Sequence, residues 1–300
     1  MVESRIEKNQ ERTEDIIEEE RKKKNKKLLK IMFWIFVPLF IIFSVFYFLL
    51  TYVGNKGIIV REYAIEDEKL PVIFNGLKIV QFSDVHYNVY SSLSKLEKIV
   101  EMINNTNPDI VVFTGDLVDN DYSITIEDEE KLMNIFKKIN STIGKYAIYG
   151  EEDSEIFKEI FNNSDFIILD NEVVKIYKDN SSVDLIAFNS NSINFELENR
   201  NPENYAISLV HKPDYSDEII ERFNPNIILS GHSHNGQVIL PFIGPLMKKE
   251  GSKKYILNSY KIKDTYLYIS GGIGNTKYNF RLFNNPSINF YRLRTINMSY

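Results

Sequence analysis

The chain has 300 residues, with 36 basic and 42 acidic side chains, four histidines and no cysteine. Residues 54–300 hold only 26 of the basic side chains but 34 of the acidic ones, so their net charge is about −8. This balance disfavours a nucleic-acid-binding protein, whose surface needs clustered positive charge. The lack of cysteine excludes a disulfide framework and is compatible with a protein outside the cytoplasm without establishing it.

The chain begins with two blocks of opposite charge. Residues 1–20 hold eight acidic side chains, and residues 21–30 hold seven basic ones. The stretch contains no Gly or Pro and could form a solvated helix, but its composition favours a disordered tail. We therefore expect residues 1–30 to be a charged tail.

An uncharged stretch of 23 residues, 31–53, follows the basic block. As a helix it would be roughly 34 Å long, enough to cross a hydrocarbon core of about 30 Å. It is too long for the apolar part of a signal peptide, and no small-residue cleavage site follows it. We expect an uncleaved, single-pass helix in the cell membrane. The basic flank predicts a cytoplasmic N-terminus, which leaves residues 54–300 outside the cytoplasm.

Residues 54–300 are long enough for one core, and no repeat or Gly/Ser-rich linker divides them. Apolar periodicity predicts strands near 77–82, 110–113, 146–149, 172–188, 206–210, 226–229, 237–240, 255–260, 265–270 and 288–293. It predicts helices near 93–104, 129–139, 154–161 and 216–222. Strands that alternate with helices and then dominate the end of the chain indicate an α/β fold, a two-sheet sandwich with helices outside.

All four histidines lie just after predicted strands, where open α/β sheets place their ligands. They are His86, His211, His232 and His234. Residues at i and i+2 leaving a strand point to the same side, so Asp84 can face one cavity with His86. Asp116 follows another strand. An isolated histidine is usually a satisfied polar residue, but this shared placement with carboxylates indicates a site for Mn, Fe or Zn.

In their order and spacing, these segments resemble the calcineurin-like metallophosphoesterases, especially the bacterial membrane-associated or exported branch. The resemblance covers nearly all of residues 65–295. It rests on four motifs, on the run from Leu70 to Val80 before them, and on the run from Leu240 to Leu246 after them. The four motifs are Asp84-Val85-His86, Gly115-Asp116 with Asp119, His211-Lys212-Pro213-Asp214, and Gly231-His232-Ser233-His234-Asn235-Gly236-Gln237. The family implies a four-layer αββα metallophosphoesterase sandwich that binds two divalent metal ions. These ions activate a hydroxide that attacks a phosphate ester.

The resemblance also implies a ligand set. One metal ion would be held by Asp84, His86, Asp116 and His234. The other would be held by Asp116, His211 and His232, so that Asp116 bridges the two. We interpret Asp119 as support behind a ligand, although a carboxylate that stabilises a turn or helix start is an equal alternative.

The chain departs from the family pattern after the third strand. The family has Gly-Asn-His followed by an acid, whereas this chain has Gly150-Glu151-Glu152-Asp153. Glu151 could replace the Asn as an oxygen ligand of the second metal ion. Glu152 replaces the His that positions the phosphate; protonated it could serve as the catalytic acid, but ionised it would repel the substrate. Alternatively, these acids only begin a solvated helix, with Asp153 and Ser154 as its cap.

Two functions of different classes remain open. The first is a membrane-anchored phosphoesterase that acts outside the cytoplasm on diesters or on phosphorylated lipid or cell-envelope components. The second is a catalytically weakened metal-binding envelope protein with the same fold. Glu151 and Glu152 separate the two, and the acidic charge disfavours a nucleic-acid phosphodiesterase.

Overall fold

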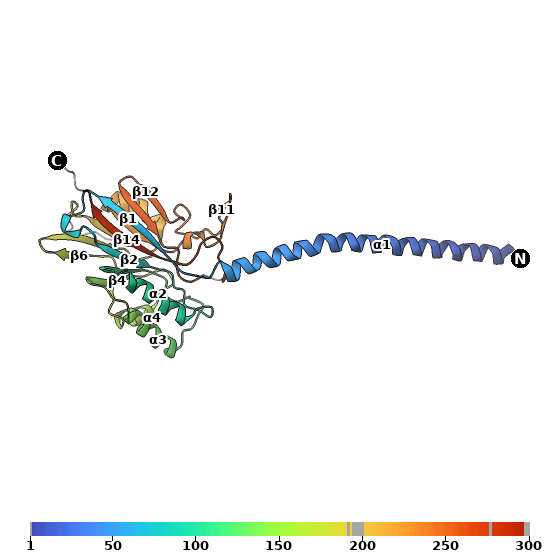
Figure 1. The fold of residues 1–300 in the computed structure, drawn as a ribbon, viewed down its shortest axis with the longest axis horizontal. Helices are drawn as coiled ribbons and strands as arrows, with labels where there is room; N and C mark the ends of the chain where they lie inside the picture. Colours follow the sequence, from blue (N-terminus) through green and yellow to red (C-terminus); the bar gives the residue numbers. More distant parts are fainter. Residues whose placement is uncertain (1, 191–192, 194–200, 276–277, 297–300) are drawn as a thin grey trace. The chain divides into compact units, whose positions relative to one another are not determined.

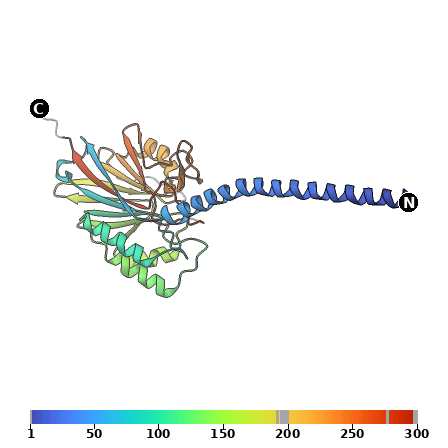
Figure 2. The ribbon, with the colours of Figure 1, turned by 45° about the vertical axis from the view of Figure 1, so that its right-hand side comes forward.

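The computed structural model describes residues 2–190, 193, 201–275 and 278–296. It divides into a helical unit that ends at Leu49 and a compact unit that begins at Leu50. Figures 1 and 2 show both units as ribbons.

The helical unit is the continuous helix α1 (Val2–Phe48), and a π-helical segment (Leu49–Val53) follows it. Residues 2–30 are therefore helical, and the prediction of a disordered tail is wrong for them. Exposed ion pairs one helical turn apart favour the helix slightly, since Lys22 lies 2.6 Å from Glu18 and Lys23 lies 3.1 Å from Glu19. Between Asp15 and Val53 this helix is long and apolar enough to cross a membrane.

Two six-stranded sheets form the compact unit. The order of the first sheet is β1 (Ile59–Asp67), β14 (Ser287–Thr295), β2 (Lys78–Phe82), β3 (Ile110–Thr114), β4 (Gly144–Ile148) and β5 (Ile167–Leu169). The order of the second is β12 (Ser259–Ile262), β13 (Thr265–Ile269), β9 (Ile227–Ser230), β8 (Ala206–Val210), β7 (Ser181–Ala187) and β6 (Glu172–Lys178). A separate two-stranded hairpin joins β10 (Ile239–Leu240) and β11 (Gly244–Pro245).

Helices cover both outer faces of the sandwich. The helices α2 (Leu93–Asn105), α3 (Ile126–Lys137) and α4 (Glu155–Asn162) lie on one side of the first sheet (Figure 1), and their buried residues pack against it. Buried residues of α5 (Ser216–Phe223) pack on the second sheet. A third apolar cluster, with Ile79 from one sheet and Leu209 from the other, fills the space between the sheets. The predicted four-layer αββα sandwich is confirmed.

The pairing of strands brings the predicted site together. Neighbours β2, β3 and β4 run parallel in one sheet, and β7, β8 and β9 run parallel in the other. Their carboxyl ends therefore meet at one edge of each sheet. Gln81 connects the two sheets beneath this edge, because its amide donates to the Thr114 hydroxyl and to the Ser230 carbonyl at 2.9 and 2.8 Å.

Most predicted elements occur within a few residues of their expected bounds, but the strand predicted at 255–260 begins only at Ser259. In the residues before Ser259, the backbone amides donate to side chains instead of to a neighbouring strand. The Asp214 carboxylate accepts hydrogen bonds from the amides of residues 253–255, and the Tyr260 hydroxyl accepts them from the amides of residues 256 and 257. Such local bonds compete with strand pairing.

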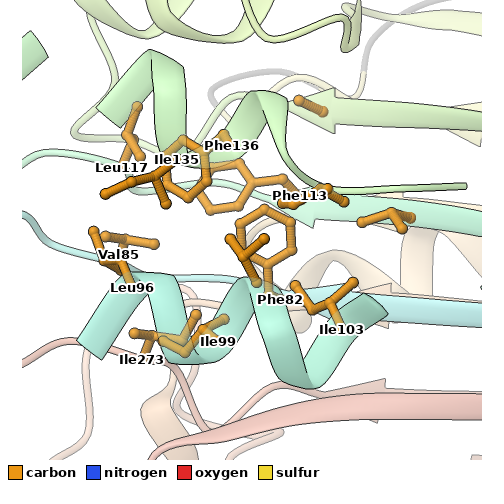
Figure 3. Close-up of a cluster of buried hydrophobic side chains, with 14 of the residues drawn as sticks. Phe82, Val85, Leu96, Ile99, Ile103, Phe113, Leu117, Ile135, Phe136 and Ile273 are labelled. Carbon is orange, nitrogen blue, oxygen red and sulfur yellow. The ribbon is translucent and has the colours of Figure 1, made fainter. Parts of the chain in front are cut away.

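Aromatic packing holds the helices to the first sheet. Figure 3 shows Phe82, Phe113 and Phe136 in this cluster. The Phe113 ring centroid lies 4.9 Å from that of Phe82 and 4.7 Å from that of Phe161. Phe113 is fully buried, so its removal would leave a cavity that the rigid sheet cannot close.

We therefore expect Phe113→Ala to lower the free energy of unfolding by about 3–5 kcal/mol, because transfer and cavity terms add. Denaturant unfolding of the full chain in mild detergent measures this change. Ile126→Ala, at a side chain that is 78% exposed, is the control and should stay within about 0.5 kcal/mol of wild type. Equal effects of the two substitutions would contradict the assignment of this core.

Candidate metal centre

Each predicted ligand lies in a loop at the carboxyl end of a parallel strand. Asp84 and His86 follow β2, and Asp116 follows β3. Glu151 and Glu152 follow β4, His211 follows β8, and His232 and His234 follow β9. Five of these residues have positive φ angles between 42° and 65°: Asp84, His86, Asp116, His232 and His234. Such angles are unfavourable for side-chain-bearing residues and cluster at functional sites.

One group of potential ligand atoms comes from Asp84, His86 and His234, all buried. The Nε2 atoms of the two histidines are 3.1 Å apart. Asp84 Oδ1 lies 3.3 Å from His234 Nε2 and 3.9 Å from His86 Nε2. The backbone amide of His232 donates to Asp84 Oδ1 at 2.9 Å and thereby fixes the carboxylate.

A second group comes from Asp116, Glu151, His211 and His232. His211 Nε2 lies 3.2 Å from Asp116 Oδ2 and 3.4 Å from Glu151 Oε2. His232 Nδ1 lies 3.0 Å from the same Glu151 oxygen. His86 Nε2 lies 3.6 Å from Asp116 Oδ2, so Asp116 reaches both groups, as expected for a bridging carboxylate.

Four atoms of the second group have no hydrogen-bond partner among the described residues. They are Asp116 Oδ2, Glu151 Oε2, His211 Nε2 and His232 Nδ1. An unpaired buried polar atom is costly, and four that converge on one point need a common partner. Two carboxylate oxygens and two imidazole nitrogens match the donors of a divalent transition-metal ion, so the residues present fit the ions that the family implies.

Backbone carbonyls and Asp119 orient the imidazoles. His211 Nδ1 lies 2.6 Å from the Thr114 carbonyl oxygen, and His232 Nε2 lies 2.6 Å from the Glu250 carbonyl oxygen. His86 Nδ1 lies 2.8 Å from Asp119 Oδ1, the supporting place expected for Asp119. Such bonds fix the ring tautomer and leave the other nitrogen free to bind a metal ion.

The charges of the site are strongly coupled. Burial opposes the charge of His86, but its contacts with Asp119 and Glu152 raise its pKa to about 10. Burial lowers the pKa of His234 to about 3. Despite their burial, Asp84 and Asp116 have pKa values below the ordinary range because imidazoles face them. The carboxylates are therefore anions, and the centre attracts positive charge.

The two glutamates that follow β4 lie on opposite sides of Asp116. Glu151 belongs to the second group, whereas Glu152 Oε2 lies 3.5 Å from His86 Nδ1 and accepts from the Asn120 amide at 3.2 Å. His86, Asp116 and Glu152 form a third set of donors near one another. Glu152 thus contacts the first group but keeps about a fifth of its side chain exposed.

Asp153 has a role that the sequence interpretation missed. Its carboxylate accepts the backbone amides of Gly150, Asp116 and Leu117 at 2.7–2.9 Å. Burial and the nearby Asp116 raise the pKa of Asp153 to about 7. Ser154 is the N-cap residue of α4, as the alternative expected, but its side chain makes no cap bond, and Asp153 holds the loops that follow β3 and β4 together. Its position in the Gly-x-x-acid run was the available signal.

Arg281 was also missed, since it lies far from the motifs in sequence. Its fully buried guanidinium donates to the carbonyls of Gly271, Gly272 and Gly274 at 2.5–3.2 Å. Nη2 lies 3.4 Å from His234 Nδ1. Arg281 therefore holds the wall behind His234. Burial lowers the pKa of Arg281 to about 9.

The centre opens into a cavity of about 660 Å³. Glu151, Glu152 and Asp119 line it on the side of the centre, and Lys249 adds a positive charge. Val89, Tyr90, Met247 and Tyr278 provide apolar or aromatic surface. Lys212 Nζ lies 3.6 Å from Glu151 Oε2. The lining of the cavity is therefore mainly acidic, because Asp121 joins the three acids above and Lys249 is its one cation, and an apolar surface lies beside these charges.

Known proteins share these features. The profile of the calcineurin-like phosphoesterases matches residues 77–236, which include every predicted ligand. An uncharacterized metallophosphoesterase, YkuE of Bacillus subtilis, is 30% identical over 79% of this chain and 85% of its own length. The UDP-2,3-diacylglucosamine pyrophosphatase LpxG of Chlamydia muridarum is 24% identical over 74% of this chain and 86% of its own.

A third relative comes from an animal. The transmembrane protein with metallophosphoesterase domain of Danio rerio is 28% identical over 69% of this chain, which spans about half (51%) of that protein. The profile match covers the strands and loops that build the centre, and the YkuE match extends over most of the compact unit. The chain therefore belongs to the calcineurin-like phosphoesterase family.

Proposed function

We propose that the protein is a membrane-anchored phosphoesterase, most active on diesters, that uses two divalent metal ions outside the cytoplasm. The observation that carries this proposal is the set of unpaired donor atoms on Asp116, Glu151, His211 and His232 beside an open cavity. Asp84, His86 and His234 would hold the other ion. When bound, the ions would neutralise phosphate charge and activate water.

The chain's own residues would bind and orient the ester. Lys249 lines the cavity, and its charge acts on both His86 and His234, so it lies within electrostatic reach of a phosphate at the centre. Glu152 stands at the edge of the same cavity, where a protonated carboxyl could give its proton to the leaving oxygen. The Asn120 amide fixes the orientation of this carboxyl.

A lipid-related or cell-envelope substrate suits both the cavity and the anchor. The relative from Chlamydia muridarum is named for a diacylated nucleotide sugar. Tyr90, Met247 and Tyr278 offer apolar contacts beside the charged centre, as an amphiphilic phosphate ester requires. The candidate membrane helix would restrict the enzyme to substrates near the bilayer.

The metal ions give the first test. We expect about two Mn²⁺, Fe or Zn²⁺ ions per chain after mild purification and reconstitution, measured by elemental analysis. Asp116→Ala should remove the most metal, since this carboxylate reaches both groups. Asp264→Ala, at an exposed turn, is the control and should keep full content. A wild-type protein without metal would contradict the ligand assignment.

Topology gives the second test. The basic block at 21–30 should keep the N-terminus in the cytoplasm. A reporter that is active only outside the cytoplasm should be active when fused after Tyr300 and inactive when fused before Met1. The opposite pattern would overturn the proposed location.

Glu152 gives the third test, because it separates an enzyme from a weakened relative. If Glu152 is the acid, Glu152→Gln should lower turnover of ordinary diesters by roughly 10²-fold, with a smaller loss for activated leaving groups. Steady-state assays of the two ester types measure this difference. Glu155→Gln is the matched control, since its side chain is 87% exposed, and it should retain turnover.

A second substitution, Glu152→His, tests the alternative function, a catalytically weakened metal-binding protein. Glu152→His rebuilds the family pattern and should restore or raise activity if the fold supports catalysis. An inert wild type with a strongly active His variant would show that Glu152 disables the site, and the metal-binding envelope protein would replace the enzyme. If both proteins were inert with metal bound, neither role assigned to Glu152 would hold.

A further inference from the structure

The hairpin of β10 and β11 exposes apolar side chains at its tip. Phe242 is 110% exposed relative to an extended reference, the highest value among the large apolar side chains that the structure describes. Ile243 is 72% exposed and Leu246 is 51% exposed. Exposed apolar side chains grouped in this way on the surface of a domain indicate a contact surface for a partner or a membrane.

The hairpin holds these side chains outward on a fixed frame. Ile239 pairs with Pro245, and the Leu246 amide donates to the Val238 carbonyl at 2.9 Å. At the base, the Ile239 amide donates to the Leu282 carbonyl at 3.0 Å. Phe242 has a φ of 67°, an unusual angle for a bulky residue. Hydrogen bonds between the backbones of the two strands therefore hold the tip of the hairpin in place.

The charge next to the tip favours an anionic surface. Residues 239–250 contain Lys248 and Lys249 and one acidic side chain, the exposed Glu250, so their net charge is about +1, although residues 54–300 carry a net charge of about −8. Lys248 is exposed. Apolar side chains followed by lysines are typical of segments that enter the boundary between lipid headgroups and acyl chains.

The first residues of the compact unit are bonded to the loop that also holds the base of the hairpin. The Leu50 carbonyl accepts from the Arg281 amide at 2.9 Å, and the Asn55 side chain donates to the Asn279 carbonyl at 3.0 Å. Leu282, the next residue after Arg281, is bonded to the hairpin base. The segment that leaves the proposed membrane helix and the hairpin therefore share one loop.

We propose that the β10–β11 hairpin inserts Phe242 and Ile243 into the interface of the anionic bilayer in which the chain is anchored. This inference rests on the proposed membrane anchoring. Beyond the tip, Met247 and Lys249 line the cavity, and the Glu250 carbonyl orients His232. One short segment thus runs from the bilayer to the metal centre, so a lipid phosphate ester can enter the cavity from the membrane surface.

The single tryptophan of the chain, Trp34, makes a direct test possible. The full chain is placed in vesicles of phosphatidylcholine and phosphatidylglycerol, with or without brominated acyl chains. In a Trp34→Phe background, Phe242→Trp creates one reporter at the tip. We expect brominated lipid to lower its emission about twofold, because an inserted ring contacts the acyl chains.

The matched control carries Ile126→Trp in the same background, at a side chain that is 78% exposed on α3. Its emission should not respond to brominated lipid. If the tip reporter behaves like this control, the hairpin does not insert and the inference is overturned. The same result follows if the tip emission is blue-shifted but insensitive to bromine, since protein rather than lipid would then cover it.

Trp34 in the wild-type chain tests the anchoring separately, because it lies in the uncharged stretch. If Trp34 is quenched and the tip reporter is not, the membrane anchor is supported and only the insertion of the hairpin is refuted. Absence of quenching at Trp34 would refute the anchor on which the inference rests. None of these measurements depends on turnover, so they remain decisive even if the protein hydrolyses no ester.

Discussion

The buried carboxylate of Asp116 is the constraint around which the site is built. A charge taken out of water costs several kcal/mol unless opposite charge and hydrogen bonds compensate it. Here the compensation comes from both sheets: His86 follows β2, His211 follows β8, and the Glu152 amide donates to Asp116 Oδ1 at 3.1 Å. The packing is tight, since a Cβ on Gly150 would collide with this carboxylate. Small changes in either loop would therefore move the shared ligand.

The departure from Asn-His to Glu151-Glu152 changes the charge of the site as well as its donors. The two acids face different groups, 3.0 Å from His232 and 3.5 Å from His86. The chain offsets part of this charge locally, because Lys212 pairs with Glu151 and Lys249 lines the same cavity. The two lysines do not balance the charge, because the cavity is also lined by Asp119 and Asp121. The surplus of carboxylates near the two groups of ligand atoms favours the binding of cations.

The sequence predicted which side chains cluster at the candidate centre better than it predicted the residues that hold them in place. Strand ends concentrate histidines and carboxylates in short motifs, so their meeting at one edge follows from parallel pairing. Asp153 and Arg281 act through backbone groups, and only Asp153 stands in a recognisable run, Gly150 to Asp153, whereas Arg281 lies in no motif. Strand β1 was not predicted. It pairs with β14, which lies more than 220 residues away, and a local pattern of apolar residues contains no information about so distant a partner. The prediction of a strand before Ser259 was wrong for the opposite reason, since local hydrogen bonds to side chains prevent the strand that the apolar pattern predicts.

The first residues of the compact unit are connected to the candidate metal centre by hydrogen bonds. Asn55 accepts from Asn275 at 2.6 Å, and Asn275 accepts from the Arg281 guanidinium at 2.7 Å. Arg281 in turn holds the glycine turn behind His234. Because each of these groups is satisfied by the next, a shift at residues 50–55 would have to break polar bonds or move the wall of the site. Residues 50–55 are therefore part of the framework of the site, since their hydrogen bonds hold the wall behind His234 in place.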